Sequence, residues 1–147
     1  MDAFAGQAQE AIGFFGFRGA EYAFGLAGAP CEVRVSTDDG SMGAHALVTD
    51  LVWDALDAAN SKAANSIKEQ APDLIMACGP VPMLHALQNL ALRERIDCQI
   101  SLEEYMACGL GACLVCSCKA RARHGVEYRR VCVDGPVFDA REVCLDG

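Results

Sequence analysis

The segment that decides the fold is residues 73–103, which read "DLIMACGPVPMLHALQNLALRERIDCQISLE". Its first apolar run stops at Gly79-Pro80, and an amphipathic helical pattern with a proline in its first turn follows over residues 82–96. A second short apolar run, "DCQISLE", begins at residue 97. Strand, helix and strand in succession predict one unit of a parallel sheet with a helix packed on it.

The N-terminal part of the chain repeats this alternation. Apolar runs at residues 11–17 and 31–37 predict strands, a short helix is expected at 20–29, and i, i+4 spacing of apolar residues predicts an amphipathic helix at 46–58. We therefore expect an α/β fold with a partial parallel Rossmann-like sheet and flanking helices. The G-x-G-x-x-G turn that normally opens such a nucleotide-binding sheet does not occur before residue 40.

The pattern changes near residue 103, where glycine and cysteine replace the apolar periodicity. We predict a partial nucleotide-binding domain at residues 1–103 and a small, irregular, β-rich domain at residues 104–147. Within the second domain, "RARHGVEYRR" at residues 121–130 predicts a hairpin turn around Gly125. Docking of a partner is the functional alternative for this basic segment.

Composition excludes several classes of function. A net charge of -8 over 147 residues argues against nucleic-acid binding, which needs a basic face to neutralise phosphates. No apolar segment reaches the ~20 residues that cross a bilayer. The beginning, "MDAFAGQAQEAIG", lacks the basic region of a secretory signal, so we expect a cytoplasmic location. In that compartment, nine cysteines indicate metal or redox roles rather than disulfides.

Four of the cysteines have a diagnostic spacing. Cys108, Cys113 and Cys116 follow C-x4-C-x2-C, and Cys132 comes after fifteen intervening residues. This is the plant-type [2Fe-2S] spacing, in which one loop provides three thiolates and a distant segment provides the fourth. Glycines within the loop, at positions 109 and 111, would let the backbone wrap closely and point N–H groups at the sulfurs.

Other interpretations of these cysteines remain open. A structural zinc site also uses four thiolates, although usually as two close pairs, and a disulfide framework would need an oxidising compartment. A zinc-stabilised interaction module would be colourless, whereas a [2Fe-2S] protein is red-brown. Cys118 lies two residues after Cys116, and we predict a small buried residue on a strand rather than a ligand.

Four motifs together resemble a known family. They are "TDDGSMGAHALVTD", "CGPVPMLHAL", "SLEEYMACGLGACLVCSCKA" and "RVCVDGPVFDAREV", in this order. From "FFGFRG" onward the chain resembles the electron-transfer subunit of the two-subunit, NAD-linked dihydroorotate dehydrogenase of bacteria. It departs from that family in having no counterpart of the FAD-binding barrel, a longer insert, "SKAANSIKEQA", and Leu114-Val115 where a glycine is common.

The resemblance implies an electron relay. Electrons would pass between NAD, FAD and a [2Fe-2S] cluster, and on to the FMN of a separate dihydroorotate dehydrogenase catalytic subunit in pyrimidine synthesis, the family forming heterotetramers. A flavin must stand between two-electron hydride donors and a one-electron cluster, so we expect this chain to be inactive alone. The alternative within the enzymes is a relay subunit of another ferredoxin-reductase-like flavin oxidoreductase.

The resemblance also implies roles for individual residues. The cluster ligands would be Cys108, Cys113, Cys116 and Cys132. The nicotinamide would lie beside Cys78, Gly79 and Pro80, at the carboxyl end of a strand where open α/β sheets bind ligands. The adenosine half would be bordered by Arg18, Asp38 and Asp39. Burial at a strand end explains Cys78 as well, and ordinary turn chemistry explains Asp-Asp-Gly.

Overall fold

The computed structural model describes residues 11–60 and 72–145. The chain divides into two compact units, Met1–Ala71 and Pro72–Gly147, and each is described here by itself. The expectation that the N-terminus holds no signal rests on residues 1–13, most of which lie outside the described residues. The long insert at residues 61–71 lies outside them entirely. Within the described ranges, no helix combines the length and apolarity that a membrane span requires.

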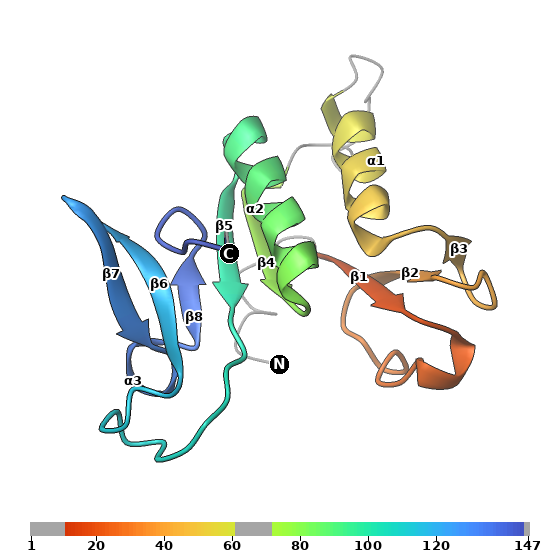
Figure 1. Cartoon of the computed structure of the whole chain (residues 1–147). Coiled ribbons are helices and arrows are strands. Elements are labelled where there is room, and N and C mark those ends of the chain that lie inside the picture. The colour runs from red at the N-terminus through yellow and green to blue at the C-terminus, as the bar shows by residue number, and fades with distance from the viewer. Residues whose placement is uncertain (1–10, 61–71, 146–147) are drawn as a thin grey trace. The chain divides into compact units, whose positions relative to one another are not determined.

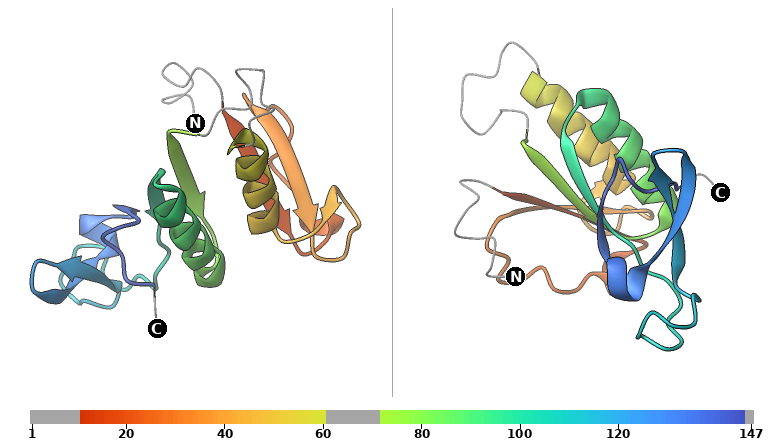
Figure 2. Two further views of the ribbon diagram at one scale, coloured as in Figure 1. Left: turned by 90° about the horizontal axis from the view of Figure 1, so that it is seen from above. Right: turned by 90° about the vertical axis from the view of Figure 1, so that its left-hand side faces the viewer.

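The first unit contains a parallel three-stranded sheet. Strands β1 (Ile12–Phe17), β2 (Glu32–Thr37) and β3 (Ala44–His45) are adjacent in this order. Helix α1 (Val48–Asn60) follows and packs along β1 and β2 (Figure 2). Both predicted strands and the amphipathic helix are thus confirmed. Leu56 is the buried residue of α1, whereas the residues of β1 are half-buried or exposed.

The helix expected at residues 20–29 is wrong. Only the short 3-10 helix η1 (Ala20–Tyr22) forms, and the chain then continues without regular structure. Gly25 and Gly28 adopt φ values of +73° and +81°, in the left-handed region that a right-handed helix cannot contain. The small residues that suggest a helix instead supply turns.

The second unit contains the strand–helix–strand segment. Strand β4 (Leu74–Cys78) pairs in parallel with β5 (Asp97–Ser101), and α2 (Val81–Glu94) connects them and packs on both (Figure 1). Strand β8 (Val137–Asp139) pairs antiparallel with the other edge of β5. The sheet order is therefore β4-β5-β8.

A hairpin and a one-turn helix complete this unit. Strands β6 (Ser117–Ala122) and β7 (Gly125–Arg130) pair antiparallel, with Ala122 opposite Gly125 at the turn. The predicted hairpin at residues 121–130 is confirmed. Helix α3 (Val131–Asp134) follows β7 directly. Because β6 and β7 are antiparallel, α3 lies next to the segment that precedes β6.

The hydrophobic core of the second unit joins the sheet to the cysteine-rich segment. Ile100 on β5, Leu84 on α2 and Val131 on α3 are each at most 1% exposed and belong to one cluster of buried residues. Gln88 of α2 is also buried, and its amide nitrogen donates to the carbonyl oxygens of Ala140 and Val143 at 2.5 and 2.8 Å. The C-terminal segment is thereby fixed to the helix.

The α/β fold class is confirmed, with parallel strands distributed over two sheets rather than one. The boundary between residues 1–103 and 104–147 stays a prediction. Strand β8 lies within the predicted second domain, residues 104–147, yet it extends the sheet that β4 and β5 form in the first. The two predicted domains therefore share a sheet and a core in this unit.

Candidate metal centre

The four spaced cysteines come from two segments of the second unit. Cys108 and Cys113 lie in the irregular loop between β5 and β6, Cys116 directly precedes β6, and Cys132 lies on α3. The backbone N–H of Val131 donates to the carbonyl of Cys116 at 3.0 Å. Since Val131 is buried in the core, this bond places α3 and its cysteine beside the end of the loop.

The thiols are arranged as two pairs. The first pair is Cys108 and Cys113, and Cys113 acts on the pKa of Cys108 through both its backbone and its thiol. The backbone N–H of Leu110 donates to the Cys108 sulfur at 3.4 Å. This N–H, followed by backbone and thiol donors of Cys113, lowers the pKa of Cys108 to about 6. Cys108 is therefore mostly thiolate at neutral pH, the form that binds metal.

The second pair is Cys116 and Cys132. The backbone N–H and then the thiol of Cys132 lower the pKa of Cys116, while the same thiol contact and then burial raise the pKa of Cys132. Of the two thiols, Cys116 therefore loses its proton more readily than Cys132. Metal binding would displace the Cys132 proton, which makes affinity for metal fall as pH falls.

The backbone of the loop has the conformation that such a site requires. Gly109 and Gly111 adopt φ values of +64° and +79°, and the N–H after Gly109 is the one that reaches the Cys108 sulfur. Leu114 also has a positive φ, +62°, which costs a residue with a side chain about 1 to 2 kcal/mol. A glycine at this position would adopt the same backbone without that cost.

The donor set fits an iron–sulfur cluster. Thiolates are the ligands that iron–sulfur clusters select, and a [2Fe-2S] cluster takes four of them, two for each iron. In residues 11–60 and 72–145, no three His, Cys, Asp or Glu side chains converge as ligands of a single ion. The two pairs of thiols, with backbone N–H donors around them, match a centre with two irons.

Two further cysteines of the unit, Cys118 and Cys98, are buried in the core cluster that also contains Cys116. Cys118 is 8% exposed on β6, and Cys98 is 3% exposed on β5. Burial raises the pKa of Cys118, and it raises that of Cys98 to about 11. The expectation that Cys118 is a small buried strand residue is confirmed, and its exclusion from the ligand set stays a prediction.

The residues expected beside nicotinamide also lie in the second unit. Cys78 ends β4, and Gly79 and Pro80 lead into α2. Cys78 is exposed rather than buried, and its sulfur lies 3.8 Å from a carboxylate oxygen of Glu103. A cavity of about 210 Å³ runs from Gly79 and Glu103 to the start of β6, where Cys118 lines it. The cavity therefore connects the end of β4 with the residues that follow the proposed ligand Cys116.

The residues expected beside adenosine lie in the first unit. Arg18 follows β1, and Asp38 and Asp39 follow β2, so the structure places all three at the carboxyl ends of adjacent parallel strands. The Asp39 carboxylate accepts bonds from the backbone N–H and hydroxyl of Ser41, at 2.9 and 2.6 Å. The bond from the Ser41 hydroxyl is the largest cause of the lowered pKa of Asp39, and the bond from the Ser41 N–H is the next. Asp39 therefore stabilises its own turn, in keeping with the ordinary turn chemistry of Asp-Asp-Gly.

Sequence reasoning missed one residue of the centre, Arg130. Residues 121–130 predict a hairpin, but the last of them also donates from Nη1 to the carbonyl of Gly111 in the cysteine loop, at 3.0 Å. No spacing rule relates an arginine to a backbone carbonyl nineteen positions earlier. The signal that the sequence offers is a basic residue two positions before a predicted ligand, Cys132.

Comparisons with known proteins agree with this geometry. Residues 103–144 match the family model of the iron–sulfur cluster binding domain of dihydroorotate dehydrogenase B. Relatives named dihydroorotate dehydrogenase B (NAD(+)), electron transfer subunit, occur in Caldanaerobacter subterraneus subsp. tengcongensis, 47% identical over 76% of this chain and 40% of the relative. That of Fusobacterium nucleatum is 46% identical over 78% of this chain and 39% of the relative.

A solved structure is similar over nearly the whole chain. It is the NADH-dependent reduced ferredoxin-NADP oxidoreductase described in work on flavin-based electron bifurcation, with a TM-score of 0.65 and 25% identity. The similarity covers 93% of this chain and 45% of that one. The fold and the site thus define an α/β protein of the ferredoxin-reductase type that carries an iron–sulfur cluster binding domain.

Within that class, the chain is related to the electron transfer subunits of dihydroorotate dehydrogenase B, and the predicted family resemblance is confirmed. The chain spans about two fifths of the length of the curated relatives that it matches.

Proposed function

We propose that this chain relays single electrons through a [2Fe-2S] cluster held by Cys108, Cys113, Cys116 and Cys132. The electrons pass between NAD(H) and FAD on one side and the FMN of a dihydroorotate dehydrogenase catalytic subunit on the other, in pyrimidine biosynthesis. The observation that carries the proposal is the arrangement of the four thiols as two pairs, inside the segment that matches a cluster-binding domain.

When bound, the cluster supplies a one-electron redox couple whose potential depends on ligands, hydrogen bonds and exposure. The chain's own residues provide those conditions. Backbone N–H groups donate to the thiolate of Cys108, and the core residue Val131 holds the Cys132 segment against Cys116. These contacts limit how far the ligand-bearing segments can move relative to each other.

The proposed route toward NAD(H) uses the cavity at the end of β4. Cys78, Gly79 and Pro80 are proposed to border the nicotinamide. Gly79 lines the cavity, whose wall continues to Ser117 beside the proposed ligand Cys116. Arg18, Asp38 and Asp39 are proposed for the adenosine half, where Arg18 and Asp38 are exposed at the carboxyl ends of their strands.

A partner subunit is supported by the surface around the cysteine loop. Large apolar side chains there are exposed: Tyr105 at 89%, Leu110 at 84%, Leu114 at 62% and Val115 at 51%. Large exposed apolar side chains gathered on one loop are available for burial against a protein partner. We propose that the FMN-containing catalytic subunit covers this loop in a heterotetramer. We also propose a cytoplasmic location, where all nine free cysteines would stay reduced.

A specific observation favours one second candidate. The similar solved structure is a ferredoxin-NADP oxidoreductase, so a relay that serves another flavin oxidoreductase fits the same fold. Its identity to this chain is 25%, against 47% for a dihydroorotate dehydrogenase B subunit. The dihydroorotate dehydrogenase assignment is therefore preferred.

The test is electron transfer to the proposed partner. The chain is reconstituted with iron and sulfide, reduced with dithionite, desalted anaerobically and mixed with oxidised FMN-containing catalytic subunit, while the visible absorbance is followed. We expect reoxidation whose rate saturates with partner concentration, because transfer needs a docked complex. Equal rates with the FMN-free subunit would contradict the proposal, and faster reoxidation by oxidised ferredoxin would favour the second candidate.

A further inference from the structure

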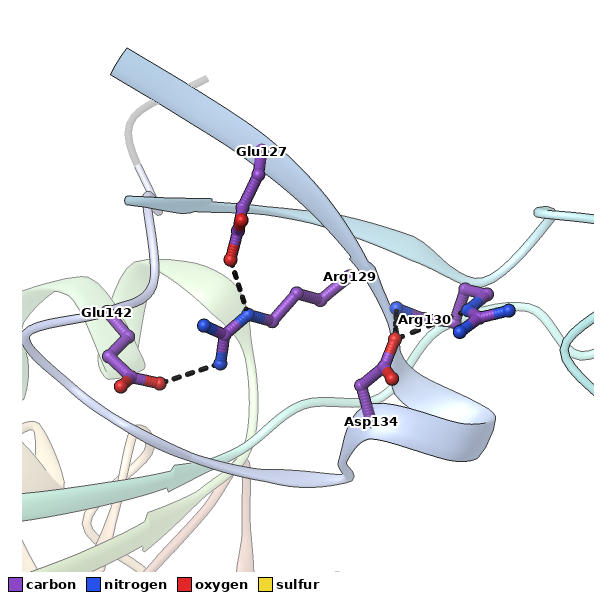
Figure 3. A network of polar contacts seen from close by, with 5 residues as sticks. All are labelled: Glu127, Arg129, Arg130, Asp134 and Glu142. Carbon is purple, nitrogen blue, oxygen red and sulfur yellow. Dashed lines mark hydrogen bonds and ion pairs between the residues drawn. The ribbon is translucent and has the colours of Figure 1, made fainter. Parts of the chain in front are cut away.

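Arg130 connects the two segments that provide the paired thiols. It is the last residue of β7 and immediately precedes α3, which carries Cys132. Its Nη1 donates to the carbonyl oxygen of Gly111 at 3.0 Å. The Asp134 carboxylate accepts from the Arg130 backbone N–H at 2.8 Å and from its Nε at 3.3 Å (Figure 3). Asp134 therefore orients the guanidinium, and the guanidinium in turn bonds the cysteine loop.

The carbonyl that Arg130 contacts belongs to a peptide unit that also faces a sulfur. The Gly111 C=O and the Ala112 N–H are parts of one planar peptide, so fixing the first orients the second. The Ala112 N–H is among the backbone groups, after those of Leu110 and Cys113, that lower the pKa of Cys108. A cationic donor on the carbonyl also polarises the peptide and strengthens the donation from its N–H.

The same loop residue serves the second pair of thiols. The Cys116 thiol and burial raise the pKa of Cys132, and the backbone N–H of Gly111 opposes that rise. A Cβ at Gly111 would lie 2.6 Å from a methyl of Val133 and 3.2 Å from Nη1 of Arg130. The loop thus approaches α3 as closely as a residue without a side chain permits. The Gly111–Ala112 segment therefore carries N–H groups that act on one thiol of each pair.

The charge of Arg130 has a direct electrostatic consequence. Reduction adds one negative charge to the set of thiolates and bound irons, and a nearby cation favours the more negative state. The bond to Gly111 is partly buried, where such interactions are screened less than on the surface. Arg130 is two residues from Cys132 in sequence, and its guanidinium bonds a carbonyl that lies between Cys108 and Cys113 in the loop.

We propose that Arg130 is a positioning residue that holds the Gly111–Ala112 peptide against the cysteines and raises the reduction potential of the bound cluster. The proposal rests on the proposed function, in that these four cysteines hold a [2Fe-2S] cluster. It assigns Arg130 no contact with a substrate and no role in proton transfer.

The neighbouring Arg129 offers a matched control. It lies on the same strand, but its side chain points to the other side of β7 and pairs with Glu127 and Glu142, both at 2.8 Å (Figure 3). Replacing either arginine with methionine removes one positive charge and keeps a flexible apolar stem. Only the Arg130 replacement removes the bond to Gly111.

The experiment compares the whole chain with its R130M, R130K and R129M variants, each reconstituted with iron and sulfide. Redox titration should show a lower potential for R130M, by at least roughly tenfold in the reduced-to-oxidised ratio, which is about 59 mV for a one-electron couple. R130K should lie between R130M and the unmodified chain, since lysine keeps the charge without the planar fork. R129M should match the unmodified chain. The electron-spin signal of the reduced R130M and R130K variants should also differ in its g values.

The outcomes separate this proposal from the proposed function. If the unmodified chain assembles no cluster, the proposed function fails. If it does and R130M and R129M have the same potential and signal, the role of Arg130 is overturned. If R130M loses its fold by far-UV circular dichroism, R130K decides, and an unshifted potential with unchanged g values in R130K contradicts the proposal.

Discussion

Replacing Cys132 with serine is expected to reduce the iron content of the reconstituted chain by roughly tenfold or more. Serine is a hard oxygen donor, whereas iron–sulfur clusters select thiolates. The effect should be large because Cys132 is the one proposed ligand outside the loop, and it forms a pair with Cys116. Iron and sulfide analysis, with the visible spectrum, measures the result.

The matched control is Cys118→Ser. Cys118 is 8% exposed on β6 and packs in the core, so the substitution should leave the spectrum intact and destabilise the fold by about 1 kcal/mol. Both variants replace a cysteine with serine, but only Cys132 belongs to one of the thiol pairs. Equal loss of iron in both would show that the ligand assignment is wrong.

Replacing Gly43 with alanine is expected to destabilise the first unit by about 3 to 5 kcal/mol. Gly43 has a φ of +69°, and a Cβ there would overlap the backbone carbonyl of Val35 on β2. A backbone atom inside a parallel sheet cannot move aside without breaking the pairing. The loop that this glycine closes also carries Asp38 and Asp39, so their placement depends on it.

Gly25→Ala is the control for that prediction. Gly25 has nearly the same φ, +73°, but a Cβ added there would meet no atom within 4 Å. The substitution should cost only the left-handed strain, about 1 to 2 kcal/mol. Trp53 is the single tryptophan of the chain and lies on α1, so urea unfolding followed by its fluorescence reports on this unit. A Gly43→Ala loss no larger than that of Gly25→Ala would refute the steric argument.

The parts of the fold that sequence predicted well share a local cause. Strands β4 and β5 alternate between exposed and more buried residues, helix α2 buries one face, and β1 is a continuous short apolar run. Each of these patterns is visible in the sequence. The wrong helix at residues 20–29 has suitable composition, but Gly25 and Gly28 turn the chain instead. Local composition therefore misleads where the backbone, rather than a buried face, determines structure.

The parts that sequence could not predict depend on contacts between distant segments. The pairing of β8 with β5 joins residues that no periodicity relates, and it brings the C-terminal segment into the sheet. The cysteine spacing identifies the proposed ligands, yet only the structure shows that they form two pairs. The bond from Arg130 to Gly111 likewise appears only once the hairpin and the loop are placed.

The most direct test of the central claim is the metal content and spin state of the chain purified without oxygen. The account predicts two irons and two labile sulfides per chain, a red-brown colour, and a rhombic electron-spin signal that appears only after reduction with dithionite. Stoichiometric zinc in a colourless protein, with no signal after reduction, would contradict it.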